Sequence, residues 1–185
     1  MANDVHASGG RRGIPWRMIG WSIPVLLLLL PLGAMQFTNE VVWTASDFVF
    51  AAVLFGSVGL AFEVIMRKSS SLAYRSGAAL AVITAFLTIW VNAAVGMIGD
   101  GAFNLLFGGV LFVALIGAVM ARLESSGMAR AMVAAAIVQG ILSAIGFSMD
   151  PRGGIFSMAF AGLWLLAAAL FRNAARSQVA GHAAP

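Results

Sequence analysis

Long apolar stretches, separated by short polar ones, run along most of this 185-residue chain. The hydrocarbon core of a bilayer is about 30 Å thick, and a helix that crosses it needs about 20 mainly apolar residues. Six stretches approach this length, at about 18–37, 45–66, 76–98, 102–121, 128–148 and 155–171. The pattern therefore predicts an all-α integral membrane protein with six transmembrane helices.

The short polar stretches carry turn and capping signals. Thr44 and Asp47 fit a capping box, in which the Asp47 side chain bonds back to the backbone at the start of the second helix. Gly99-Asp100-Gly101 predicts a tight turn after the third helix, and Asp150-Pro151 with the glycines behind it predicts another before the sixth. These signals support the same helix count.

The first segment admits two interpretations. Pro24 and Pro31 interrupt it, which membrane helices tolerate better than soluble ones. Because the segment follows a basic start and leads into Leu32-Gly33-Ala34, it also resembles a signal peptide cleaved after Ala34. A retained helix is favoured, since the apolar run is long and Leu32 is bulky for a cleavage site.

Composition points to a membrane protein. Apolar residues make up 61% of the chain and charged residues 10%, against about a half and about a quarter in soluble domains. We expect one six-helix transmembrane domain over residues 14–172, between cytoplasmic tails at 1–13 and 173–185. The chain has no cysteine, which excludes disulfides and thiolate metal sites.

The positions of the charges predict the orientation. With the N-terminus inside, only Arg152 lies outside, and ten basic residues lie on the cytoplasmic side: Arg11, Arg12, Arg17, Arg67, Lys68, Arg75, Arg122, Arg130, Arg172 and Arg176. This asymmetry follows the positive-inside rule and places both termini in the cytoplasm. The net charge of +4 therefore does not indicate nucleic-acid binding, and the expected partner is the lipid bilayer.

Glu63 is the carboxylate that falls within an apolar segment. An ionisable group inside a membrane is by default a functional candidate, as in proton relays and ion sites. Arg67, however, follows one turn later in the favourable order for an ion pair, and both side chains can reach the headgroup layer. A structural pair is favoured over a proton or ion role.

Polar and aromatic residues gather at the predicted outer turns. We call them the predicted outer cluster: Asn39, Glu40, Trp43, Asp47, Asn92, Asp100 and Asn104. Carboxylates and amides under an aromatic side chain could bind a cation or an amine. The alternative, which is favoured, is that Asp47 caps a helix, Asn92 bonds across helices, and Glu40, Asp100 and Asp150 are solvated turn residues.

Small residues at four-residue spacing predict close helix packing. Ala136, Gly140 and Ala144 repeat in this way on the fifth segment, and Gly117 and Ala121 on the fourth. Such spacing lets helix backbones approach closely in membranes. The same spacing also arises easily in a chain this rich in alanine and glycine.

Several catalytic motifs are absent from the sequence. The two histidines, His6 and His182, lie in the predicted tails, so an H-E-x-x-H zinc site or a histidine haem site inside the membrane is excluded. There is no P-loop string. We therefore expect no enzyme activity, no cofactor and no metal.

Several motifs, which together span nearly the whole chain, carry a resemblance to a known family. The opening motif is Leu30-Pro31-Leu32-x-Ala34-Met35-Gln36-Phe37-Thr38-x-Glu40-Val41-x-Trp43-Thr44-x-x-Asp47-Phe48. Further matches are Gly59-Leu60-Ala61-x-Glu63 followed by Arg67-Lys68, Ala73-Tyr74-Arg75, Trp90-x-Asn92-x-Ala94-Val95-Gly96-x-Ile98-Gly99, Gly127-Met128-Ala129-Arg130-Ala131, Trp164-Leu165-Leu166 and Ala174-Ala175-Arg176. These motifs resemble those of a family of small, uncharacterised bacterial polytopic inner-membrane proteins. The resemblance implies a bacterial inner-membrane location and a retained first helix, but no activity. The turn after Gly99 is shorter here than the family's acidic, proline-containing turn.

The expected function is non-enzymatic, as a small transporter or as an accessory membrane subunit. An accessory subunit would self-associate as a homo-oligomer or dock on another membrane protein. The alternative is an ion- or proton-coupled small transporter that uses Glu63 or the predicted outer cluster.

Overall fold

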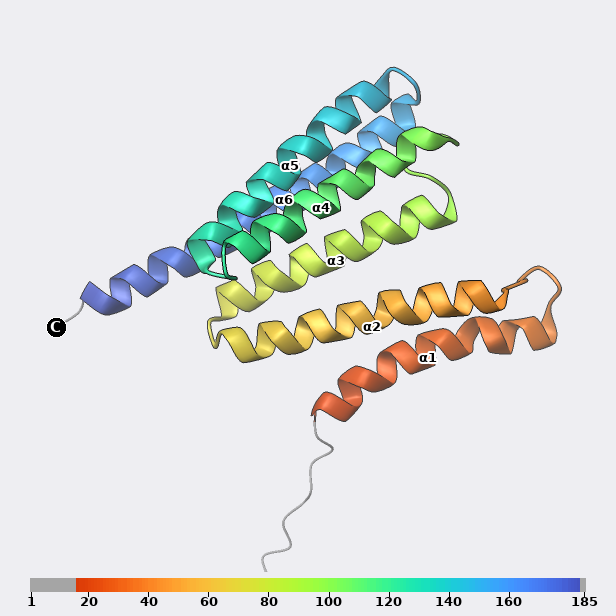
Figure 1. The fold of residues 1–185 in the computed structure, drawn as a ribbon, viewed down its shortest axis with the longest axis horizontal. Coiled ribbons are helices and arrows are strands. Elements are labelled where there is room, and N and C mark those ends of the chain that lie inside the picture. Colours follow the sequence, from red (N-terminus) through yellow and green to blue (C-terminus); the bar gives the residue numbers. More distant parts are fainter. Residues whose placement is uncertain (1–15, 184–185) are drawn as a thin grey trace, which may run out of the picture. The chain divides into compact units, whose positions relative to one another are not determined.

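The computed structural model describes residues 16–183, with side chains from residue 20 to residue 180. Within this range every regular element is helical (Figure 1): α1 Trp16–Phe37, α2 Ala45–Lys68, α3 Leu72–Ala94, η1 Ala102–Leu106, α4 Phe107–Met120, α5 Ser125–Phe147 and α6 Pro151–Ala183. Six stretches are long and apolar enough to cross a membrane, and η1 with α4 forms the fourth of them. The prediction of an all-α, multi-pass membrane protein with six helices is confirmed.

α3 begins and ends earlier than the predicted 76–98. It begins early because the Ser71 side-chain oxygen accepts a hydrogen bond from the Tyr74 amide at 3.4 Å, which caps the first turn. It ends early because Gly96 has a φ of 74°, a left-handed conformation that does not continue a helix. A Cβ atom at Gly96 would lie 2.5 Å from the Gly99 carbonyl oxygen, so this turn requires glycine.

The turn between α4 and α5 has left-handed backbone at two residues that are not glycine. Arg122 has a φ of 48° and Leu123 a φ of 58°, and such residues cost about 1–3 kcal/mol each. The Tyr74 hydroxyl donates to the Leu123 carbonyl at 2.7 Å, and the Leu123 amide donates to the Ala118 carbonyl at 3.1 Å. These bonds hold the turn and connect it to α3.

α6 is longer at both ends than the predicted 155–171. It starts at Pro151, and proline suits the first helical position because the amide there has no partner within the helix. Beyond Phe171 the apolar pattern stops, but alanine, arginine and glutamine are good helix formers and the helix continues. Most of the predicted tail 173–185 is therefore helical in the described part, whereas the predicted tail 1–13 lies outside the described residues.

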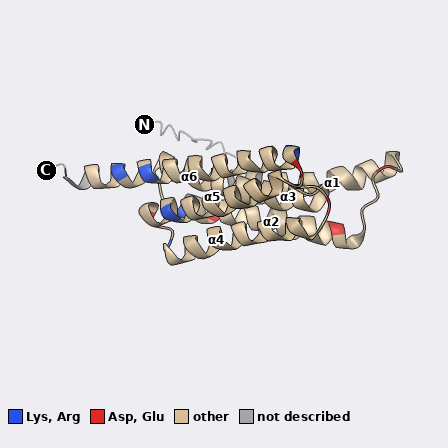
Figure 2. Cartoon of the chain, turned by 90° about the horizontal axis from the view of Figure 1, so that it is seen from above, with Lys and Arg blue, Asp and Glu red and all other residues tan. Residues whose placement is uncertain are grey.

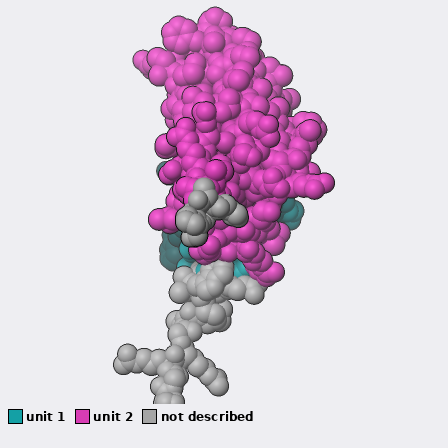
Figure 3. All heavy atoms as spheres, turned by 90° about the vertical axis from the view of Figure 1, so that its left-hand side faces the viewer, with its two compact units in different colours: residues 1–59 teal, residues 60–185 magenta. Residues whose placement is uncertain are grey.

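Contacts within the chain form two compact units, coloured separately in Figure 3. Unit 1 is Met1–Gly59 and unit 2 is Leu60–Pro185, so the division falls within α2. In unit 1 the Trp21 ring packs on the backbone at Gly59, where an added Cβ atom would lie 3.3 Å from it. A single domain over 14–172 stays a prediction.

α5 and α6 form the centre of unit 2, with α3 packed on α6 and α4 packed on α5 (Figure 1). Small residues allow the α4–α5 contact to be close. A Cβ atom at Gly117 would lie 2.6 Å from the Ala131 Cβ, and one at Gly127 would lie 2.6 Å from the Ala121 Cβ. The predicted close packing at Gly117 and Ala121 is confirmed.

The predicted packing residues on α5, which are Ala136, Gly140 and Ala144, do not all lie in a close helix contact. Ala136 is buried, but Ala144 is exposed and a Cβ atom at Gly140 would meet nothing within 4 Å. Among the described residues, Gly140 therefore makes no close helix contact. A contact between Gly140 and a second chain stays a prediction.

Candidate functional sites

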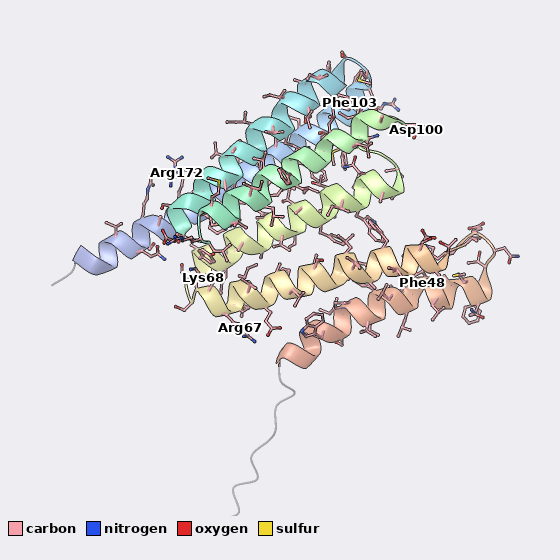
Figure 4. All side chains as sticks on the ribbon, in the orientation of Figure 1. Phe48, Arg67, Lys68, Asp100, Phe103 and Arg172 are labelled. Atoms are coloured by element: carbon pink, nitrogen blue, oxygen red, sulfur yellow. The ribbon has the colours of Figure 1, made fainter. Side chains whose placement is uncertain are left out.

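Glu63 and Arg67 form an ion pair on the last turns of α2. The Arg67 guanidinium donates to a Glu63 carboxylate oxygen at 2.6 Å. The Glu63 side chain is 17% exposed and the Arg67 side chain 71% exposed, and Figure 4 shows Arg67 projecting from the end of α2. This geometry matches the predicted structural pair, because Arg67 follows Glu63 by one turn and extends outward.

Asp47 caps α2, as the capping box predicts. One Asp47 carboxylate oxygen accepts from the Thr44 amide at 2.7 Å and from the Thr44 hydroxyl at 2.7 Å. The Thr44 hydroxyl also lies 2.7 Å from the Ser46 hydroxyl. This oxygen is occupied by local hydrogen bonds, which supports a structural role for Asp47.

The remaining residues of the predicted outer cluster in unit 1 lie in and beside the α1–α2 turn. Asn39 and Glu40 are exposed. The Glu40 amide donates to the Thr38 hydroxyl at 3.1 Å. Trp43 packs edge-on against Phe48, with ring centroids 5.2 Å apart. These contacts order the turn.

Asn104, from the unit 2 part of the predicted outer cluster, organises the turn between α3 and η1. Its side-chain oxygen accepts from the Met97 amide at 3.0 Å and from the Ile98 amide at 2.9 Å. Its side-chain nitrogen donates to the Gly99 carbonyl at 2.8 Å. Asp100 lies at the exposed tip of this turn (Figure 4). Asn104 is therefore a turn-forming residue, with both ends of its amide in use.

Asn92 does not bond across helices, contrary to the interpretation favoured from the sequence. Its side-chain nitrogen donates at 2.6 Å to the carbonyl of Thr88, one turn earlier on α3. Its side-chain oxygen is buried and has no hydrogen-bond partner among the described residues. Asn92 thus keeps an unused acceptor inside unit 2.

Asp150, which the sequence suggests is a solvated turn residue, connects two turns. One carboxylate oxygen accepts from the Gly99 amide at 3.3 Å, and the other accepts from the Arg152 amide at 3.1 Å. Hydrogen bonds from the backbone of Gly153, and then of Gly99 and Arg152, hold the pKa of Asp150 below its usual value, against the opposing effect of burial. The start of α6 is thereby tied to the turn between α3 and η1.

A buried polar cluster that the sequence analysis missed lies between α5 and α6. It consists of Gln139, Ser143 and Ser157, each at most 1% exposed. The Gln139 side-chain nitrogen donates to the Ser157 hydroxyl at 2.9 Å, and the two serine hydroxyls lie 2.7 Å apart. The signal in the sequence was a glutamine near the middle of an apolar segment, with a serine one turn later. Interhelical hydrogen bonds of this kind join membrane helices.

The α3–η1 turn covers the buried polar cluster. The Met97 sulfur lies 3.5 Å from the Gln139 side-chain nitrogen, and Met97 is itself buried. Ile98 packs so tightly on Gly146 of α5 that a Cβ atom there would collide with it. Because Asn104 fixes both residues through their amides, it also positions this cover.

Hydrogen-bonding capacity remains unused inside unit 2. Four buried side-chain atoms have no partner among the described residues: Asn92 Oδ1, Ser125 Oγ, Gln139 Oε1 and Trp164 Nε1. An unmade hydrogen bond at a buried group costs about 1–3 kcal/mol. Each of these atoms therefore carries a desolvation cost that a hydrogen-bond partner would remove.

The chemistry of these sites is hydrogen bonding and ion pairing. No three Asp, Glu or His side chains gather closely enough to hold a metal ion in the part of the chain that the structure describes. Comparison of the chain with protein-family models, with curated proteins and with solved structures finds no match in any of the three. The helices alone therefore define the class of this protein, which is a polytopic helical membrane protein.

Proposed function

We propose that this is a non-enzymatic protein of a bacterial inner membrane that works as a small transporter for an uncharged polar solute. The observation that carries the proposal is the free Gln139 side-chain oxygen in the buried polar cluster. An acceptor without a partner is costly in an apolar interior, so a site that keeps one favours a hydrogen-bonding solute.

The absence of charge in the buried polar cluster supports an uncharged solute. Gln139, Ser143 and Ser157 offer amide and hydroxyl groups, and the Met97 sulfur beside them is neutral. A charged solute would have to leave water without gaining a counter-charge there, which costs far more than the transfer of a neutral one. Exchange would require the cover formed by Met97 and Ile98 to move away from α5.

Osmotic swelling of proteoliposomes tests this proposal. Glycerol and urea serve as neutral probes, and entry is followed by stopped-flow light scattering. We expect wild-type protein to speed entry of at least one probe relative to empty liposomes, and Gln139→Met to abolish the increase. Gln36→Met is the matched control, because Gln36 is exposed on α1 and donates to the Leu32 carbonyl. Equal rates in empty and wild-type liposomes would refute transport of such solutes, and unchanged Gln139→Met rates would refute the role of the cluster.

An ion- or proton-coupled transporter is the alternative. Glu63 supports this alternative because it is a carboxylate within the apolar span of α2. Its ion pair with Arg67 argues against the alternative, because a carboxylate that carries protons must lose its charge. The Glu63→Gln variant distinguishes a proton-carrying role from a structural ion pair, in a proton-flux assay with a pH-sensitive dye inside the liposomes. Loss of flux with unchanged thermal stability would favour the alternative, whereas loss of stability without any flux change would favour the structural pair.

An accessory subunit is a further candidate, favoured by the open surface at Gly140. A glycine on a transmembrane helix with nothing within 4 Å leaves room for a helix of a second copy or of another membrane protein. Native mass spectrometry in mild detergent tests this. A homo-oligomer or a retained partner would support docking, and a bare monomer carrying lipid alone would favour the transporter. The resemblance of the opening motif to bacterial inner-membrane proteins supports the location, with both termini cytoplasmic.

A further inference from the structure

A basic cavity lies between α5 and α6, at the end of unit 2 where α5 begins. Its volume is about 540 Å³, and its walls include Arg130, Arg172, Arg176 and Ser126. Figure 2 shows basic residues on α5 and α6 at this end, and in Figure 4 Arg172 projects from the ribbon. The structure records no ion pair between these three arginines and any described carboxylate.

Three arginines in one cavity repel one another unless an anion lies between them. Arg172 and Arg176 are one turn apart on α6, a spacing at which like charges destabilise a helix. Arg130 faces the same cavity from α5. Guanidinium groups match the geometry of phosphate oxygens and bind them through paired hydrogen bonds.

The first turn of α5 adds donors beside this cavity. Glu124 is the N-cap residue but makes no side-chain capping bond. The first amide hydrogen bond of the helix runs from Met128 to the Glu124 carbonyl, so the amides of residues 125–127 have no recorded acceptor. Such an uncapped start attracts anions through its free amides and the helix dipole.

Ser125 gives independent evidence for a ligand at this point. It is 4% exposed, and its hydroxyl oxygen has no hydrogen-bond partner among the described residues. It lines a second cavity of about 540 Å³, together with Lys68 and the carboxylate-bearing Glu124. Both cavities include Ser126 and Ala175 in their walls, so they lie next to each other near the start of α5.

We propose that the start of α5 binds the phosphate group of an anionic ligand. Arg130, Arg172 and Arg176 contact it from one cavity, and Lys68 with the Ser125 hydroxyl contacts it from the other. Glu124 is the one carboxylate in these walls, and a free N-cap side chain can turn outward to solvent. Phosphate chemistry of this kind is offered by an anionic lipid headgroup and by soluble phosphate. Basic pockets between membrane helices bind such headgroups.

Titration of the delipidated protein in a neutral detergent tests the site and distinguishes the two sources. Phosphatidylglycerol, phosphatidylcholine and inorganic phosphate are added separately, and binding is followed by native mass spectrometry and by thermal unfolding. A headgroup site predicts that phosphatidylglycerol binds more tightly than phosphatidylcholine. A soluble-phosphate site predicts stabilisation by inorganic phosphate alone. No preference for phosphatidylglycerol together with no effect of phosphate would overturn the proposal.

Charge-removing variants locate the site. All three arginines are exposed, so Arg172→Gln with Arg176→Gln should fold. We expect affinity to fall about fivefold per arginine removed, which corresponds to about 1 kcal/mol each. Arg152→Gln is the matched control, because Arg152 is an exposed arginine at the opposite end of α6. An equal loss in the control variant would show a diffuse charge effect and refute the site.

The Ser125→Ala variant tests whether the buried Ser125 hydroxyl contacts the ligand. Without ligand, this variant should be as stable as wild type or more stable, since it removes an unpaired buried hydroxyl. With ligand, it should bind several-fold more weakly. Unchanged affinity would show that the Ser125 hydroxyl does not contact the ligand and would exclude the second cavity from the site.

Discussion

One methyl group added at Gly117 and one added at Gly140 should change stability in opposite directions. Both glycines lie within transmembrane helices, and replacing a helical glycine by alanine gains about 0.5–1 kcal/mol of backbone entropy and propensity. At Gly140 nothing lies within 4 Å of the added Cβ atom. Gly140→Ala should therefore raise the free energy of unfolding by up to about 1 kcal/mol.

At Gly117 the added atom has no room. It would lie 2.6 Å from the Ala131 Cβ and 3.2 Å from the Ala131 Cα, whereas nonbonded carbon atoms prefer about 3.5–4.0 Å. The neighbouring atom belongs to a short side chain on a helix, so α4 and α5 must separate by about 1 Å. Overpacking of this kind costs about 1–3 kcal/mol. After the propensity gain, Gly117→Ala should lose about 1–2 kcal/mol.

Reversible unfolding in mixed micelles, with a denaturing detergent titrated in, measures both free energies. Equal stability of the two variants would refute the close α4–α5 contact. A loss at Gly140→Ala comparable to that at Gly117→Ala would show that Gly140 contacts a second chain. In that case native mass spectrometry of the wild type should show an oligomer, and the same spectrum of Gly140→Ala should show more monomer.

Three further predictions concern the turns. In the same unfolding assay, Arg122→Gly should be about 1 kcal/mol more stable than Arg122→Ala, because only glycine adopts the left-handed backbone conformation without strain. Both variants lose the arginine charge, so the charge does not affect the comparison. Equal stabilities would refute the strain. Tyr74→Phe should lose about 1 kcal/mol, since it removes the bond to the Leu123 carbonyl, and a neutral result would show that this bond contributes nothing. The pKa of Asp150 is lower in the folded state, so its stabilising contribution is complete above the unfolded value of about 3.9 and is lost as pH falls through the folded value. Thermal unfolding should therefore show Asp150→Asn less stable than wild type at pH 7, with the gap closing below about pH 4; a gap independent of pH would contradict this.

The number and type of helices followed from the sequence because a bilayer demands long apolar runs with internal hydrogen bonding. Helix ends were harder to predict, because they depend on single hydrogen bonds rather than on the apolar pattern. Ser71 caps α3 earlier than the pattern suggested, and Gly96 stops it earlier. α6 continues past Phe171 since its alanine-rich sequence is helical even where it is no longer apolar.

Contacts between residues close together in the sequence were predicted better than contacts between residues far apart in the sequence. The Glu63–Arg67 pair and the Thr44–Asp47 cap lie within one helical turn, so spacing alone identifies them. Asp150 was taken for a solvated residue because its partner Gly99 is far away in the sequence. Such pairings require knowledge of which turns meet, which a single sequence does not contain.

The polar residues at the turns and those inside unit 2 differ in whether their side chains find hydrogen-bond partners. This difference is relevant to the proposed function. At the turns, Asn104 and Asp47 have local backbone groups to bind, and they use them for structure. Inside unit 2, the Gln139 side chain uses its nitrogen for Ser157 and leaves its oxygen free. A leucine or methionine would have filled this position without a buried unpaired acceptor, although it would also have removed the bond to Ser157. The bond to Ser157 accounts for the nitrogen of this glutamine, and the proposed transport of a polar solute would give its oxygen a partner.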